Sequence, residues 1–117
     1  MKILVAEDNM MNQYLMNRYL TKLGWEFVIV ENGLLAVEAC SSGDFNAILM
    51  DIDMPVLNGI EGTKQIRLFN KEIPIVAITA YADETMRTDC AAAGMNAFLA
   101  KPCSREDIKT VITDCLK

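Results

Sequence analysis

Apolar residues in this chain are grouped in short bursts of strand length, separated by longer segments of mixed polarity. Five bursts stand out, at Lys2–Ala6, Glu26–Val30, Ala47–Met50, Ile73–Thr79 and Ala97–Ala100. The nearly continuous apolar character of ILVA, AILM and IVAI is typical of parallel strands, because both faces of a parallel sheet are covered. We therefore expect five buried strands.

The segments between the bursts have the length and signals of helices. Asn9 is placed to cap a helix that Gly24 ends, and its apolar positions recur at spacings of three and four: Met11, Leu15, Met16, Tyr19, Leu20 and Leu23. Further helices are expected at Gly33–Cys40, ending near Ser41-Ser42-Gly43, from Asn58 or Gly59 to about Phe69, and at Asp83–Ala92. A last helix opens at Ser104, which with Asp107 resembles a capping box.

This alternation predicts an α/β fold with a (βα)5, doubly wound, five-stranded parallel sheet. The common strand order for such a flavodoxin-like sheet is 2-1-3-4-5, with the winding reversed between the first and third strands. Ligands bind beyond the carboxyl ends of the strands at that reversal. With 117 residues and no linker composition, residues 1–117 are expected to form a single domain.

Composition narrows the class of protein. No stretch approaches 18 apolar residues, so no membrane span is expected, and the opening MKILVAED lacks the apolar region of a signal peptide. We therefore expect a cytoplasmic protein. The net charge is −5 and the 11 basic residues are scattered, which argues against nucleic-acid binding.

Metal chemistry based on sulfur or imidazole is not expected. The chain has four cysteines, no C-x-x-C pair and no histidine. A structural zinc site is therefore not expected, and the cysteines are expected to be buried or half-buried thiols that act as small apolar groups.

Acidic side chains follow two strands that the predicted order makes neighbours. Glu7 and Asp8 follow the first strand, and Asp51 follows the third. Adjacent strands are about 4.8 Å apart, and two carboxylates at about 4 Å repel by ~1 kcal/mol in water and ~4 kcal/mol at an intermediate dielectric. A cation relieves this repulsion, and oxygen ligands alone select Mg²⁺ or a similar hard ion.

The fourth and fifth strands add complementary groups to the same edge. Thr79 ends the fourth strand and is followed by the small Ala80, and Lys101 follows the fifth. A carboxylate nucleophile, a divalent cation, a hydroxyl and an ammonium together suit a phosphoryl group.

Four segments, AEDN, ILMDIDMPVLNG, AITA and AKP, resemble in order and spacing the receiver domain of two-component response regulators, and the resemblance covers the whole chain. It implies that Asp51 accepts a phosphoryl group from a phosphohistidine of a histidine kinase or a histidine phosphotransfer protein. Asp8 and Asp51 would bind Mg²⁺, with Glu7 contributing directly or through water and the backbone carbonyl of Asp53 completing the protein ligands.

The resemblance also implies roles around the phosphoryl group. Lys101 would pair with one phosphoryl oxygen, and Thr79, with Ala80 beside it, would bind another. Phe98 matches the family's switching aromatic residue. The bond before Pro102 is expected to be cis. The side chains of Asp53 and Tyr81 occupy positions expected to tune the lifetime of the phosphate.

Some questions stay open at this level. EDNMMNQ and LGWEFVIVENGLLAVEA look most like receivers of hybrid sensor kinases, so the chain is either a module of a longer protein or a stand-alone receiver. The oligomeric state is open. Tyr81 either contacts a partner protein or has a half-buried ring whose hydroxyl is exposed to solvent.

Two rival functions are considered. The D-x-D of Asp51 and Asp53 also occurs in aspartyl phosphatases of the haloacid-dehalogenase type, but there the motif follows the first strand of a larger fold. A receiver-like binding module that is never phosphorylated is the other rival, and the complete set of phosphotransfer groups argues against it.

Overall fold

The computed structural model describes residues 1–117 and contains five strands and five helices in alternation. The strands are β1 (Lys2–Ala6), β2 (Glu26–Val30), β3 (Ala47–Asp51), β4 (Ile75–Thr79) and β5 (Ala97–Ala100). The helices are α1 (Met10–Leu23), α2 (Gly33–Ser42), α3 (Gly59–Arg67), α4 (Glu84–Ala93) and α5 (Arg105–Cys115). The predicted (βα)5 alternation is confirmed.

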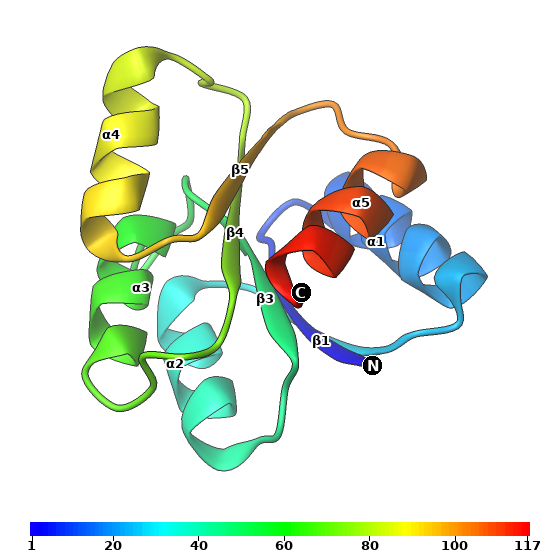
Figure 1. Ribbon diagram of the computed structural model, residues 1–117, viewed down its shortest axis with the longest axis horizontal. Helices are drawn as coiled ribbons and strands as arrows, with labels where there is room; N and C mark the ends of the chain where they lie inside the picture. Colours follow the sequence, from blue (N-terminus) through cyan, green and yellow to red (C-terminus); the bar gives the residue numbers. More distant parts are fainter.

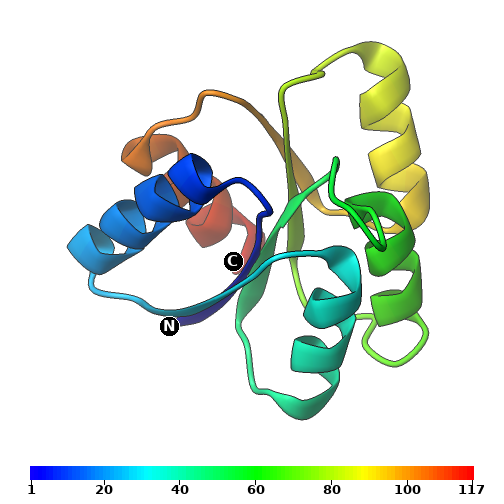
Figure 2. The same cartoon turned by 180° about the vertical axis from the view of Figure 1, so that it is seen from behind.

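All strand pairs are parallel, and the sheet order is β2-β1-β3-β4-β5, as predicted. The winding therefore reverses between the neighbours β1 and β3, where Val5 lies opposite Leu49. Helices α1 and α5 cover one face of the sheet, and α2, α3 and α4 cover the other (Figures 1 and 2). Both faces are thus buried, and the carboxyl ends of the strands form one edge.

The core has two layers because successive strand residues point to opposite faces. In β1, Leu4 and Ala6 belong to the apolar cluster under α2, α3 and α4, whereas Ile3 and Val5 belong to the cluster under α1 and α5. The predicted burial of the thiols is confirmed: Cys40 and Cys90 are buried, and Cys103 and Cys115 are half-buried.

Each helix begins at a capping residue whose side chain accepts a backbone N–H: Asn9, Asn32, Asn58, Asp83 and Ser104. The predicted box of Ser104 and Asp107 is present. Gly24 ends α1 in the left-handed region (φ 76°), where glycine carries no steric penalty. None of the helices combines the length and apolar character needed to cross a membrane.

Some predicted boundaries were wrong. Strand β4 begins at Ile75, not Ile73, because the Asn70 side chain accepts the Ile73 N–H (3.0 Å) and Pro74 has no N–H to donate. Strand β3 includes Asp51, and α4 runs over Glu84–Ala93 instead of Asp83–Ala92. The predicted end of α2 near Ser41-Ser42-Gly43 is confirmed, since this helix ends at Ser42.

Two expectations about apolar side chains were also wrong. Helix α3 ends at Arg67, so Phe69 lies beyond it and is half exposed. Met11 is 66% exposed and does not belong to the buried face of α1.

Arg67 joins α3 to α4 and β4 at the amino edge of the sheet. Its Nε and Nη2 donate to the carbonyl oxygen of Gly94 at 3.0 and 2.8 Å, and Nη2 also donates to Oδ1 of Asn96 at 2.9 Å. The same Asn96 oxygen accepts the N–H of Ile75 at 2.9 Å. Helix α4 is therefore fixed at its carboxyl end.

Arg67→Ala should lower the free energy of unfolding by about 2 kcal/mol, because charge-assisted hydrogen bonds to half-buried acceptors are lost. Arg67→Lys should lose about half as much, since a single ammonium replaces the guanidinium fork. Urea unfolding measures both. Lys64→Ala, at an exposed α3 position, is the control and should change stability by less than about 0.5 kcal/mol. An Arg67→Ala value as small as the control would contradict this role.

Candidate functional site

Asp51 is the last residue of β3 and lies at the centre of the carboxyl edge. Its side chain is buried, and one oxygen, Oδ1, accepts the N–H of Ile52 at 2.8 Å. The other oxygen, Oδ2, accepts a hydrogen bond from Nζ of Lys101 at 3.1 Å. The carboxylate is thus held by its own backbone and by the residue that follows β5.

Glu7 follows β1 and is 3% exposed. Its N–H donates to the carbonyl oxygen of Val30 at 2.9 Å, which continues the pairing of β1 with β2. Its Oε2 accepts the N–H of Asn9 at 3.2 Å, and its Oε1 pairs with Nζ of Lys101 at 3.0 Å. Gln13 of α1 donates to its carbonyl oxygen at 2.7 Å. Glu7 is therefore fixed on every side.

Gln13 was not among the predicted site residues. It stands in the stretch EDNMMNQ, but nothing in the sequence pattern shows that its amide turns back to the Glu7 carbonyl. That contact depends on the angle at which α1 leaves the edge of the sheet.

Three carboxylates meet at this edge, as predicted. One oxygen from each of Glu7, Asp8 and Asp51 lies within 4.8 Å of the others. Asp8 is exposed, so the cluster opens to solvent on its side. The donor set is made of oxygen alone, which fits a hard divalent cation such as Mg²⁺.

Asp53 lies in the loop between β3 and α3, and its side chain is exposed. Its carbonyl oxygen accepts none of the backbone hydrogen bonds of the loops. The carbonyl is therefore available to a further ligand.

The electrostatics of the cluster depend on burial. The pKa of Asp51 is raised to about 7, chiefly because burial disfavours the ionised carboxylate and also because Glu7 lies against it, while Lys101 acts in the opposite direction. Burial alone would lower the pKa of Lys101, but the hydrogen bonds and charges of Glu7 and Asp51 outweigh it and raise that pKa. Lys101 is therefore the cation that offsets the charge of Glu7 and Asp51.

The remaining predicted residues line the same edge. Thr79 ends β4, is 1% exposed, and its Oγ1 accepts the N–H of Tyr81 at 3.0 Å, which leaves the hydroxyl proton free to be donated. Ala80 is exposed. The N–H of Lys101 donates to the carbonyl oxygen of Thr79 at 2.8 Å, and the bond between Lys101 and Pro102 is cis, as expected.

Tyr81 is 61% exposed, so the half-buried alternative for its ring was wrong. Its N–H fixes the hydroxyl of Thr79, but its ring points to solvent.

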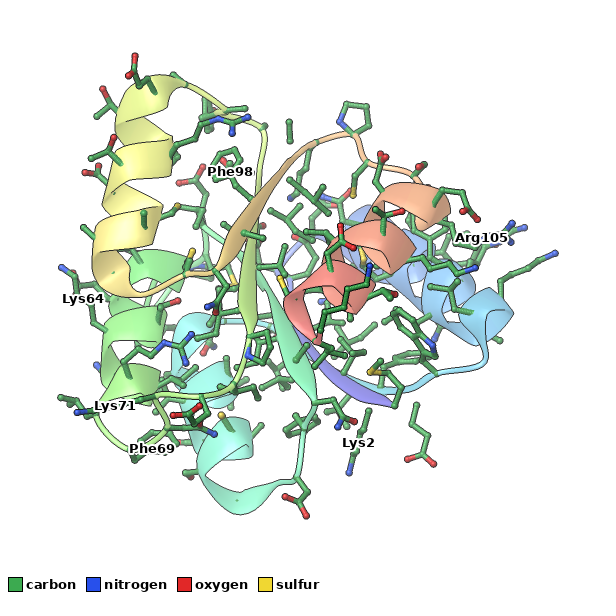
Figure 3. The ribbon with its side chains drawn as sticks, in the orientation of Figure 1. Lys2, Lys64, Phe69, Lys71, Phe98 and Arg105 are labelled. Carbon is green, nitrogen blue, oxygen red and sulfur yellow. The ribbon has the colours of Figure 1, made fainter.

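Phe98 lies in β5 and contacts neither Glu7 nor Asp51 through a polar group. Its ring is half-buried, packs against the cluster under α2, α3 and α4, and lies between β5 and α4 (Figure 3). The guanidinium carbon of Arg87, on α4, is 4.7 Å from the centre of the ring, within the range of a cation–π contact.

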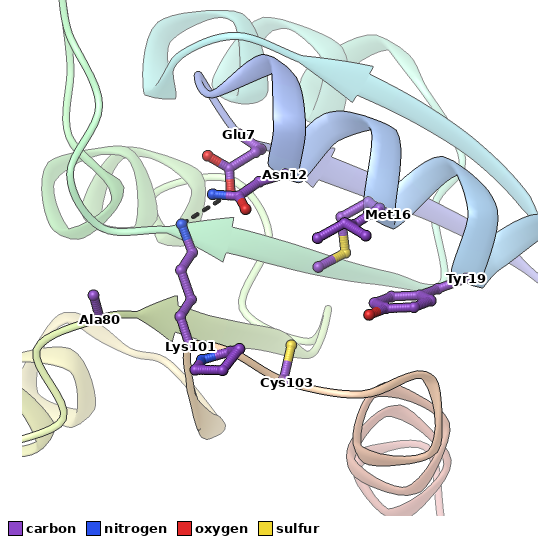
Figure 4. Close-up of a pocket in the computed structure, with 9 residues that line it drawn as sticks. Glu7, Asn12, Met16, Tyr19, Ala80, Lys101 and Cys103 are labelled. Atoms are coloured by element: carbon purple, nitrogen blue, oxygen red, sulfur yellow. Dashed lines mark ion pairs between the residues drawn. The ribbon is translucent and has the colours of Figure 1, made fainter.

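A cavity of about 310 Å³ adjoins the cluster between α1 and the loop that follows β5 (Figure 4). Its lining residues are Glu7, Asn12, Leu15, Met16, Tyr19, Ala80, Lys101, Pro102 and Cys103. The Lys101–Glu7 ion pair stands at one end of this cavity, and mostly apolar side chains form the remainder.

A family model described as the response regulator receiver domain matches residues 3–113. The chain belongs to this family. The position of Asp51 at the end of β3 argues against the phosphatase alternative, whose motif follows the first strand. The predicted receiver resemblance is thus confirmed.

Individual relatives agree with this family. The receiver is 41% identical over 97% of its length to the osmosensing histidine protein kinase SLN1 of Saccharomyces cerevisiae. It spans 10% of that kinase, and 79% of a two-component response regulator of Arabidopsis thaliana that it also matches. The chain therefore covers a small part of the length of the kinase and most of the length of the response regulator.

Two solved structures are similar in sequence as well as fold. The receiver domain of sensor histidine kinase PA1611 from Pseudomonas aeruginosa, with a magnesium ion in its active site cleft, is 37% identical with a TM-score of 0.92, covering 98% of this chain and 96% of that one. The receiver domain of Saccharomyces cerevisiae Ssk1, in complex with the histidine phosphotransfer protein Ypd1, is 32% identical with a TM-score of 0.91, covering 97% and 87%.

Because the pKa of Asp51 is raised to about 7 from 3.8, the metal-free receiver should lose stability as pH rises between these values. The folded state retains the proton over this range, whereas the unfolded state has lost it. Asp51→Asn should therefore unfold at least about 4 °C higher than wild type at pH 8 in EDTA, and the difference should vanish near pH 3. Thermal unfolding from pH 3 to 8 measures this.

Asp53→Asn is the matched control, since it removes an exposed carboxylate two residues away. It should follow the wild-type pH profile. A profile for Asp51→Asn that runs parallel to wild type at every pH would contradict the crowding at Asp51.

Proposed function

We propose that Asp51 accepts a phosphoryl group, as a receiver of a two-component phosphorelay. A carboxylate oxygen of Asp51 attacks the phosphorus of a phosphohistidine; the new O–P bond forms as the N–P bond breaks, and its electron pair returns to the imidazole. The single observation that carries this proposal is the position of Asp51, buried at the carboxyl edge between Glu7 and Lys101.

The groups around Asp51 fit that transfer. Asp8 and Asp51, with Glu7 directly or through water and the Asp53 carbonyl, would hold Mg²⁺, whose bound charge would neutralise phosphoryl oxygens. Lys101 would exchange its contact with the carboxylates for a phosphoryl oxygen, and its distance of 3.1 Å from Asp51 Oδ2 supports this.

Thr79 and Phe98 form the proposed switch. The Thr79 hydroxyl would donate to a phosphoryl oxygen, beside the small Ala80, and Phe98 would turn inward as Thr79 moves. The added charge would thereby change the surface formed by α4, β5 and α5. Asp53 and Tyr81, both exposed beside the site, would tune the access of the attacking water and so the lifetime of the phosphate.

The proposed phosphodonor is a histidine kinase or a histidine phosphotransfer protein. The Ssk1 receiver domain, 32% identical to this chain, forms a complex with such a protein, which supports the proposal. We propose that residues 1–117 act as one receiver module, and the identity of 41% to a histidine kinase favours a place in a hybrid kinase.

The receiver would catalyse its own phosphorylation and dephosphorylation without turning over a separate substrate. It would act in the cytoplasm, where free thiols such as those of Cys40 and Cys90 persist. No role in nucleic-acid or membrane binding is proposed, given the net charge of −5.

Treatment with acetyl phosphate and Mg²⁺ should add a single phosphoryl group to the wild type and none to Asp51→Asn, as read by intact mass spectrometry. Asp53→Asn should still be modified, because only its backbone is proposed to act. Modification of Asp51→Asn, or none of the wild type, would overturn the assignment; steady hydrolysis of a phosphomonoester would favour the phosphatase.

Mg²⁺ should stabilise the wild type by about 2.7 kcal/mol at 100 times its Kd, since only the folded state binds it. Asp8→Ala should lose most of this gain, whereas Asp44→Ala, an exposed acid in the loop before β3, should keep it. Thermal shift against Mg²⁺ concentration measures the difference. Equal shifts in all three proteins would remove Asp8 from the site.

A further inference from the structure

The loop between β3 and α3 contains a residue in an unfavourable backbone conformation. Val56 has a φ of 68° and is the only non-glycine residue with a positive φ. The N–H of Leu57 donates to the carbonyl oxygen of Pro55 at 2.7 Å, which closes a γ-turn around Val56. A β-branched residue in a positive-φ γ-turn is rare and unfavourable.

Strained backbone persists only where surrounding contacts impose it. Helix α2 supplies such a contact. The N–H of Gly33, its first residue, donates to the carbonyl oxygen of Leu57 at 2.8 Å. This hydrogen bond holds the loop immediately after the turn.

The approach of α2 to the loop requires a glycine. A Cβ at Gly33 would overlap the carbonyl oxygen of Leu57 and lie 2.8 Å from that of Asn58. Both atoms are backbone, so no side chain can move aside to relieve the contact. Any other residue at position 33 would push the loop away from α2.

The far end of the loop is also fixed. The N–H of Gly59 donates to the carbonyl oxygen of Ile52 at 2.9 Å, and Asn58 caps α3. Asp53 lies inside this closed segment, two residues after Asp51. Displacement of Leu57 by α2 is therefore transmitted to a short loop whose other end is held beside the carboxylate cluster.

We propose that Gly33 is a positioning residue of the receiver site. By holding Leu57, the start of α2 keeps the strained turn in place and limits the positions open to the Asp53 carbonyl in the same loop. This rests on the proposed function in one respect, namely that the Asp53 carbonyl is a ligand of Mg²⁺. Gly33 touches none of the reacting atoms and acts only through the loop.

The test compares Gly33→Ala with Gly62→Ala. Gly62 lies in α3 against Gly33, and a Cβ there meets its nearest atoms at 3.5 Å, an ordinary contact. Both substitutions add a single Cβ to a helical residue at the contact between α2 and α3. Mg²⁺ affinity, from thermal-shift titration, should fall about three- to tenfold in Gly33→Ala and stay within about twofold of wild type in Gly62→Ala.

Equal affinities in the two variants would overturn the positioning role, even if Gly33→Ala is less stable without metal. A wild type that neither binds Mg²⁺ nor takes up phosphate would instead overturn the proposed function. The two failures are therefore distinguishable.

Hydrogen exchange of the wild type supplies a second measurement that needs no variant. If the Gly33–Leu57 hydrogen bond supports Mg²⁺ binding, then by linkage Mg²⁺ must strengthen that bond. Saturating Mg²⁺ should slow exchange of the Gly33 amide at least about threefold more than that of Met95, whose N–H donates to Cys90 at the end of α4. Equal slowing of both amides would contradict the proposal. Because this measurement uses the wild type, it tests the proposal even if Gly33→Ala does not fold.

Discussion

Two buried carboxylates share one ammonium group at the carboxyl edge of the sheet. Nζ of Lys101 lies 3.0 Å from Glu7 and 3.1 Å from Asp51, and without it the two acids would face each other at a cost of about 4 kcal/mol at an intermediate dielectric. Lys101 is in turn held to Thr79 through its backbone. The contacts of Lys101 join the ends of β1, β3, β4 and β5. A change of charge at Asp51 therefore alters contacts at the ends of four strands.

The site residues are positioned by buried strands and by the segments that follow those strands. The strands are buried on both faces and fix where Asp51 and Thr79 emerge. The segments that follow them carry Glu7, Asp8 and Lys101, and Glu7 and Lys101 are held there by backbone hydrogen bonds. Val56 lies in another such segment, the loop after β3, where its unfavourable backbone is restrained by the hydrogen bond of Gly33 to Leu57 and by that of Gly59 to Ile52.

The order of the sheet and the main acids of the site were predictable because both follow from local patterns. Apolar bursts of strand length and helical spacings give (βα)5, and parallel strands end at one edge, so Glu7 and Asp51 had to meet. Boundaries were less predictable. The start of β4 depends on the side chain of Asn70 capturing the Ile73 N–H, and a hydrophobicity pattern contains no such hydrogen bond.

The sequence by itself determined the fold class, the helix-capping residues such as Asn9, and the meeting of carboxylates around Asp51, because these depend on periodicity and on the ends of strands. Only the tertiary structure decided that Gln13 holds the Glu7 carbonyl and that Gly33 touches Leu57. Those contacts depend on the angle and distance at which helices pack against loops. Residue spacing carries no information about either quantity.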